Sequence, residues 1–110
     1  MKNLLFGTAG VPISAKKSDS ASALERVKEL GLGCMELEFV RGVRMSKATA
    51  KKVAENQKKT GIELSAHGPY YINLNSQTPE KQKASVNRVL KTGRIADVCG
   101  AKSFTFHTAA

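Results

Sequence analysis

The feature that most constrains the fold is the regular alternation of short apolar segments with longer helix-like segments along the 110 residues. The three helix-like segments each end at a glycine, and these glycines, Gly31, Gly61 and Gly100, stand 30 and 39 residues apart. Such a spacing fits one strand followed by one helix. Because strands joined by helices lie parallel through right-handed crossovers, the pattern predicts an α/β protein.

Local signals place these segments. A capping residue precedes each expected helix and a glycine closes it, so helices are predicted within 18–31, 46–61 and 78–100, the last beginning at Pro79. The apolar residues expected to face inward from these helices are Leu24, Val27, Leu30, Ala50, Val53, Ala54, Val86, Val89, Leu90 and Val98. Strands are predicted at 4–6, 34–39, 62–67 and 103–107.

The last three predicted strands alternate between apolar and polar residues instead of being apolar throughout. An open sheet with helices on both faces favours nearly continuous apolar strands, whereas a closed (β/α)8 barrel has room for polar side chains inside. Such a barrel takes about 250 residues. The chain is therefore interpreted as the N-terminal half of a TIM barrel, with four parallel strands and three helices: residues 1–110 form part of a single domain that stops after the fourth strand.

Charge and composition limit the kinds of partner that this chain is expected to bind. The 18 Lys and Arg residues outnumber the 9 Asp and Glu residues, and a net charge of +9 attracts polyanions such as nucleic acid. The alternative is that the lysines simply solvate helix faces. The two cysteines form no Cys-x-x-Cys motif, and neither a secretory signal nor a membrane-spanning stretch is predicted. A cytoplasmic location without membrane partners is the expectation.

Two histidines are the candidate metal ligands. His67 and His107 are the only histidines, and each is the last polar residue of a predicted strand. On neighbouring parallel strands about 5 Å apart, their imidazoles are expected to reach one metal ion. The alternative is that each imidazole hydrogen-bonds neighbouring polar groups. No Walker loop, dinucleotide-binding motif or nucleophile elbow offers a competing chemistry.

Several motifs resemble one known family. The most specific is His67-Gly68-Pro69-Tyr70-Tyr71-Ile72-Asn73-Leu74, and Phe104-Thr105-Phe106-His107 is similar to a second motif of that family. The opening 6–10 and the run 35–44 look like more divergent matches. Together they resemble endonuclease IV, the zinc-dependent apurinic/apyrimidinic endonucleases built on a TIM barrel, over essentially the whole chain but less than half of such an enzyme. One departure is Ala9-Gly10, where many members have a histidine.

The resemblance implies a function for the complete protein. His67 and His107 would share one of up to three zinc ions, which activate a water that cleaves the phosphodiester 5′ to an abasic site in duplex DNA. Tyr70 and Arg44 match residues that enter the duplex at the lesion, and Tyr71 and Arg41 are further expected DNA contacts. The alternatives for these four residues are loop packing for the tyrosines, and solvation or simple phosphate contacts for the arginines.

Two other functions stay open. A sugar isomerase or epimerase of the xylose-isomerase-like barrels could use Glu36 or Glu38, whose role is otherwise unassigned, and a noncatalytic piece that binds nucleic acid through its basic charge is also compatible. The isolated 110 residues are expected to lack catalysis and to self-associate, because half a barrel leaves two sheet edges unpaired.

Overall fold

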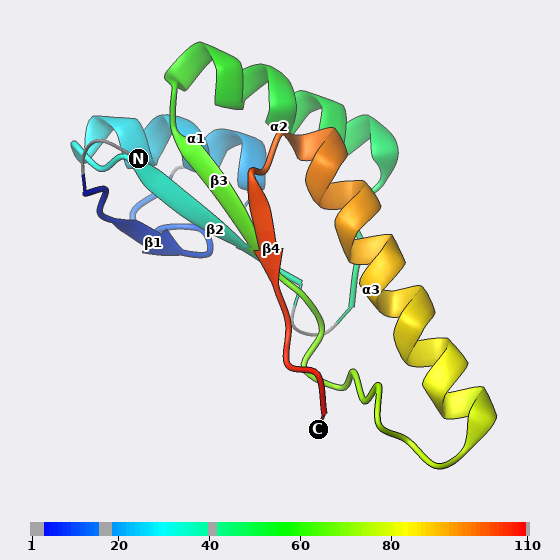
Figure 1. Ribbon diagram of the computed structural model, residues 1–110. Coiled ribbons are helices and arrows are strands. Elements are labelled where there is room, and N and C mark those ends of the chain that lie inside the picture. The colour runs from blue at the N-terminus through cyan, green and yellow to red at the C-terminus, as the bar shows by residue number, and fades with distance from the viewer. Residues whose placement is uncertain (1–3, 16–18, 40–41, 110) are drawn as a thin grey trace.

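A computed structural model describes residues 4–15, 19–39 and 42–109. The element order is β1 (Gly7–Ala9), α1 (Ser20–Glu29), β2 (Cys34–Glu38), α2 (Lys47–Thr60), β3 (Glu63–His67), α3 (Pro79–Cys99) and β4 (Ser103–Thr105). The strands form one parallel sheet in the order β1-β2-β3-β4 (Figure 1). This is the arrangement of the N-terminal part of a TIM barrel, so the predicted fold class is confirmed.

The register sorts the side chains onto two faces. Met35, Leu37, Leu64 and Ala66 are buried with apolar residues of all three helices in one core. The alternating residues form rows across the opposite face: Glu36 pairs with Ser65, and Glu38 pairs with His67. Because side chains alternate along a strand, the polar residues face away from the helices, as the alternation predicted.

The helix ends agree with the local signals. The side chain of Asp19 accepts a hydrogen bond from the Ser22 N–H at 2.7 Å, and that of Ser46 accepts one from the Thr49 N–H at 3.1 Å. Gly61 ends α2 with φ of 73°, a left-handed conformation that favours glycine. The prediction of a cap at Thr78 was wrong in one respect, because the Thr78 side chain makes no capping hydrogen bond. Pro79 occupies the first turn as predicted, where its missing N–H has no intrahelical acceptor.

The first strand lies later than predicted. It spans Gly7–Ala9 instead of 4–6, and Leu4 and Phe6 are exposed. Gly7 pairs with Cys34, and a Cβ at Gly7 would overlap the Cys34 carbonyl oxygen. The ladder of β1 therefore forms where glycine allows close approach to β2, not where the apolar run lies.

Three further details differ from the sequence prediction. The strand predicted at 103–107 ends at Thr105, and Leu30 is exposed at the end of α1. Val86 and Leu90 of α3 are exposed as well, because a helix of 21 residues is about 32 Å long and outreaches the short strands. Figure 1 shows the N-terminal half of α3 extending beyond the sheet. The buried residues of α3 are Ser85, Thr92, Ala96 and Cys99.

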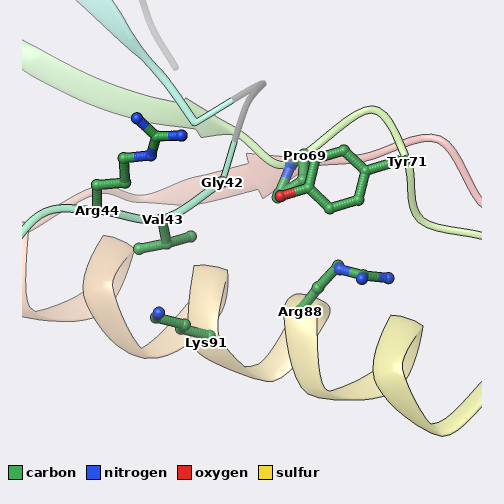
Figure 2. A pocket seen from close by; sticks show the side chains of 7 residues that line it. All are labelled: Gly42, Val43, Arg44, Pro69, Tyr71, Arg88 and Lys91. Atoms are coloured by element: carbon green, nitrogen blue, oxygen red, sulfur yellow. The ribbon is translucent and has the colours of Figure 1, made fainter.

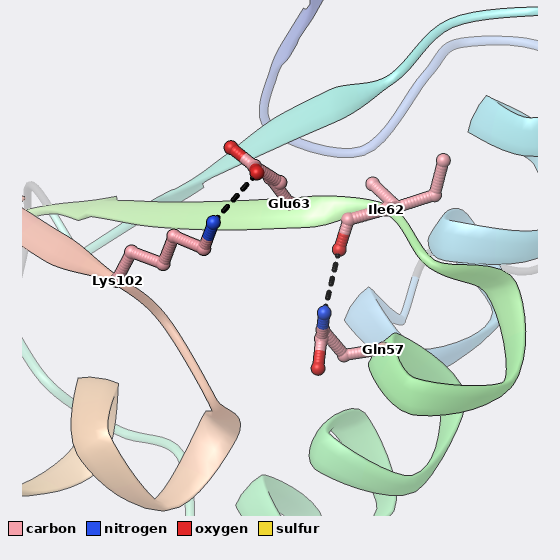
Figure 3. Close-up of polar contacts among 4 residues, drawn as sticks. All are labelled: Gln57, Ile62, Glu63 and Lys102. Carbon is pink, nitrogen blue, oxygen red and sulfur yellow. Dashed lines mark hydrogen bonds and ion pairs between the residues drawn. The ribbon is translucent and has the colours of Figure 1, made fainter. Parts of the chain in front are cut away.

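Polar contacts join the elements at the end of the sheet where β3 and β4 begin (Figure 3). The Lys102 ammonium forms an ion pair with the Glu63 carboxylate at 2.7 Å, and the Gln57 side-chain amide donates to the Ile62 carbonyl at 3.0 Å. The ion pair is solvent-exposed and contributes at most about 1 kcal/mol.

In the described ranges, no helix combines the length and apolar character needed to cross a bilayer.

Candidate functional site

The two histidines lie side by side at the C-terminal end of the sheet. His67 is the last residue of β3 and is paired with Thr105, the last residue of β4. His107 comes two residues after Thr105, on the same phase of the chain. The ring centroids of His67 and His107 are 5.4 Å apart, at an interplanar angle of 59°. Parallel register thus brings together two imidazoles that are 40 residues apart in the sequence.

This separation suits two ligands of one zinc ion. A zinc-bound imidazole nitrogen lies about 2 Å from the metal, so two imidazoles in tetrahedral positions have ring centroids about 5 Å apart. The imidazole rings of His67 and His107 contact each other, and within the described part of the chain this ring contact is the interaction seen for both side chains. In that same part of the chain, no group of three or more His, Cys, Asp or Glu residues could hold a metal. The pair is therefore a partial ligand set.

Two carboxylates lie beside the histidines on the polar face. Glu38 is the register partner of His67, and Glu36 stands two residues earlier on β2. Partial burial, a hydrogen bond with Glu36 and the repulsion of its negative charge together raise the pKa of Glu38 from 4.5 to about 7. Glu38 can therefore gain or lose a proton near neutral pH.

The loop after His67 is held firmly on both sides. The Gly68 N–H donates to the Thr105 carbonyl at 2.8 Å, and the Leu74 N–H donates to the Thr108 carbonyl at 2.8 Å. The Asn73 N–H donates to the Ser85 hydroxyl of α3 at 2.9 Å, and Ile72 is fully buried. The loop is thus tied both to the segment that carries His107 and to α3.

Tyr70 and Tyr71 project from this anchored loop. Tyr70 is 59% exposed, and its ring meets that of Tyr71 edge-on with centroids 5.5 Å apart. The Arg88 guanidinium lies 4.7 Å from the centroid of the Tyr71 ring. On the other side, a Cβ added at Gly42 would come within 2.9 Å of the Tyr71 hydroxyl. Tyr71 therefore contacts both the β2–α2 connection and α3, while most of the Tyr70 side chain is accessible to a partner.

A basic pocket of about 360 Å³ lies between these segments (Figure 2). Arg44 comes from the β2–α2 connection, Arg88 and Lys91 come from α3, and Pro69 and Tyr71 close the pocket. Among the described residues, no carboxylate lines this pocket. Arg41, the other arginine predicted from the sequence, lies outside the described residues.

Arg88 and Lys91 were missed by sequence reasoning. Their spacing of three residues places them on one helix face, which is the available signal, but basic residues on a helix face are usually only solvated. The lysines predicted to lie on helix faces, Lys47, Lys51, Lys52, Lys58, Lys59, Lys81, Lys83 and Lys91, are indeed all exposed. The loop that folds against α3 distinguishes Lys91 from the others.

Comparison with known proteins places this architecture in a family. A model of xylose isomerase-like TIM barrels matches residues 24–110. The chain belongs to that family. An uncharacterized protein of Methanocaldococcus jannaschii is a relative, 48% identical over 104 residues that make up 94% of this chain. The chain spans only 36% of the length of that relative.

Solved structures of the same fold include a nuclease and an epimerase. Endonuclease IV from Thermus thermophilus superposes on 96% of the chain with a TM-score of 0.73 at 20% identity, and the match covers 41% of that enzyme. D-psicose 3-epimerase superposes on 92% with a TM-score of 0.68 at 18% identity, covering 37% of the epimerase. SacUVDE superposes on 98% of the chain with a TM-score of 0.60 at 13% identity, and the match covers 50% of its length. At these identities the likeness establishes the barrel fold, and the chemistry depends on the residues of the site.

Proposed function

We propose that the protein carrying this chain is a zinc-dependent endonuclease of the endonuclease IV type, which cleaves the phosphodiester 5′ to abasic sites in duplex DNA. The observation that carries the proposal is the placement of His67 and His107, with ring centroids 5.4 Å apart, next to a rigid loop from which Tyr70 protrudes. The chain matches 41% of the Thermus thermophilus endonuclease IV structure, so further metal ligands are expected from the rest of the longer protein.

Each residue has a role that its surroundings support. His67 and His107 would hold a zinc ion, which supplies a Lewis acid and an activated water for attack at phosphorus. The hydrogen bonds at Gly68 and Leu74 join the loop to the segment after β4, and this backbone support would help to preorganise the two imidazoles for one ion. Tyr70 would enter the duplex at the lesion, and Arg44 would contact the strand beside it.

The metal assignment is tested by His67→Ala and His107→Ala, with Ser65→Ala on the same face of β3 as the matched control. Each histidine variant is expected to lose bound zinc, measured by atomic absorption, and to cleave an abasic duplex slower by on the order of a hundredfold or more. Ser65→Ala should keep its zinc and its rate. Scission should stop with a chelator and return with zinc. Full zinc content in both histidine variants would refute the assignment.

One observation favours a second candidate, a sugar epimerase or isomerase. Glu38 lies beside His67 on the polar face and has a pKa of about 7, which suits a group that removes a proton next to a sugar carbonyl. Under this function, Glu38→Gln would abolish exchange of sugar C–H hydrogen for solvent deuterium, followed by NMR. The exposed Tyr70 and the basic pocket favour the nuclease, since a small neutral sugar requires neither.

A further inference from the structure

We propose that the basic pocket between the β2–α2 connection, the β3–α3 loop and α3 is a binding site for a phosphate group, with Arg88 and Lys91 as its principal ligands. The histidine pair does not line the pocket, and neither Arg88 nor Lys91 belongs to the predicted metal or lesion contacts. The volume of about 360 Å³ falls within the range of about 300–1,000 Å³ that is typical of ligand sites.

The charges around the pocket are unbalanced. Arg44, Arg88 and Lys91 line it, and no acidic side chain of the described residues does. The ion pair of Lys102 with Glu63 lies at the other end of the sheet and supplies no counter-charge to the pocket. Three cationic side chains around one pocket without an acidic neighbour make the local potential positive, which favours a bound anion. The ligand is therefore expected to be anionic.

The placement of Arg88 favours phosphate over a generic anion. Its guanidinium stacks on the Tyr71 ring at 4.7 Å, and Figure 2 shows the side chain extending beneath that ring. Stacking fixes the plane of the guanidinium while its N–H groups remain available at the edge, and this geometry matches two oxygens of a phosphate. Lys91, one turn further along α3, lines the same pocket, and Figure 2 shows its side chain pointing away from the Arg88 guanidinium. Its flexible four-carbon stem would have to turn for the ammonium group to reach a third oxygen of the phosphate.

The loop that forms the pocket wall is also preorganised. Pro69 is fully buried, and the Tyr71 hydroxyl approaches Gly42 so closely that only a residue without a Cβ fits there unchanged. The Asn73 N–H is held by the Ser85 hydroxyl of α3 at 2.9 Å. These contacts hold Tyr71 next to Gly42 and fix the loop against α3, so little ordering of the loop is needed on binding.

A phosphate group could come from a nucleic-acid backbone or from a small phosphorylated ligand. The double variant Arg88→Gln/Lys91→Gln is compared with Lys81→Gln/Lys83→Gln, which removes the same charge from exposed positions of the same helix outside the pocket. Binding of inorganic phosphate is measured by calorimetry. We expect the pocket variant to bind phosphate roughly tenfold more weakly or worse, and the control variant to bind nearly as the unmodified protein does. Lys91→Gln alone, which keeps the Arg88–Tyr71 stack, should show part of the loss, and circular dichroism checks the fold.

The second arm measures duplex DNA binding as a function of salt, and it rests on the proposed nuclease function. If the pocket holds a backbone phosphate, the slope of log K against log salt is shallower in the pocket variant by about 0.9 for each phosphate that it no longer neutralises, and changes less in the control. An unchanged slope with weakened phosphate binding assigns the pocket to a small phosphorylated ligand. Equal phosphate affinity in the two double variants would overturn the inference. Zinc content and scission are read separately, so failure of the nuclease proposal leaves the phosphate result interpretable.

Discussion

The Glu36–Glu38 pair should make stability depend on pH in an unusual direction. The pKa of Glu38 rises from 4.5 to about 7, first because the carboxyl group is partly buried and then because protonated Glu38 donates a hydrogen bond to Glu36, whose charge repels the ionised form. The folded state therefore favours the protonated carboxyl more than the unfolded chain does. Its contribution to stability is fully present below about pH 4.5 and is lost as the pH rises through about 7.

The magnitude depends on the shift and on exposure. A change of pKa from 4.5 to about 7 corresponds, at about 1.4 kcal/mol per pH unit, to about 3–4 kcal/mol at most. Glu38 as a whole residue is exposed, however, so solvent screening lowers the expected effect to about 1 kcal/mol. This is still a measurable fraction of the stability of a small domain.

Urea unfolding at pH 5 and at pH 8 is the assay, applied to the unmodified protein, to Glu38→Gln and to the control Glu55→Gln on the exposed side of α2. Relative to Glu38→Gln, the unmodified protein should lose about 1 kcal/mol between the two pH values. Glu55→Gln should behave like the unmodified protein, because Glu55 is exposed and far from the pair in sequence. Parallel pH profiles for Glu38→Gln and the unmodified protein would refute the reasoning.

Three further outcomes are expected. Gly42→Ala should destabilise the fold by about 1–2 kcal/mol in urea unfolding, because φ is 119° and the new Cβ meets the Tyr71 hydroxyl. The control Gly31→Ala introduces only backbone strain, because Gly31 has φ of 76° and lies in open space. Equal losses of stability in the two variants would contradict the Tyr71 contact. Tyr70→Ala should weaken binding to abasic duplex in fluorescence anisotropy with zinc content intact, and an unmodified protein that binds abasic and intact duplexes equally would remove this role. The isolated 110 residues should self-associate through the free edges of β1 and β4, so a compact monomer in sedimentation would contradict that expectation.

The parts of the fold that the sequence predicted are those with local causes. The α2 helix carries its own start and stop in Ser46 and Gly61, and β3 shows its two faces by alternation alone. The β1 strand was misplaced because its position depends on where β2 allows close approach, which is a contact between segments distant in sequence, such as Gly7 and Cys34. Val86 was misassigned because a helix-period pattern does not reveal where the sheet beneath the helix ends.

The same distinction applies to the site. His67 and His107 could be paired from the sequence because parallel strands in sequential order fix the lateral distance between their ends. The pocket that Arg88 and Lys91 line could not be predicted from the sequence. Its other residues come from loops whose path depends on non-local hydrogen bonds, such as the one from the Asn73 N–H to the Ser85 hydroxyl. The two faces of a strand can be predicted from the alternation of apolar and polar residues, whereas a pocket between loops depends on tertiary packing.

The barrel fold alone does not decide between nuclease and epimerase, since one scaffold supports both among the structural neighbours. The decision rests on the residues at the C-terminal ends of the strands. The candidate metal ligand His67 ends β3, and the exposed Tyr70 stands three residues later on the adjoining loop. The hydrogen bond from Gly68 to Thr105 also fixes the segment that carries His107. Metal binding and substrate contact would therefore share one rigid piece of backbone. A duplex held by Tyr70 would then present its phosphodiester at a fixed distance from the histidine pair, which is the positioning that phosphoryl-transfer chemistry needs.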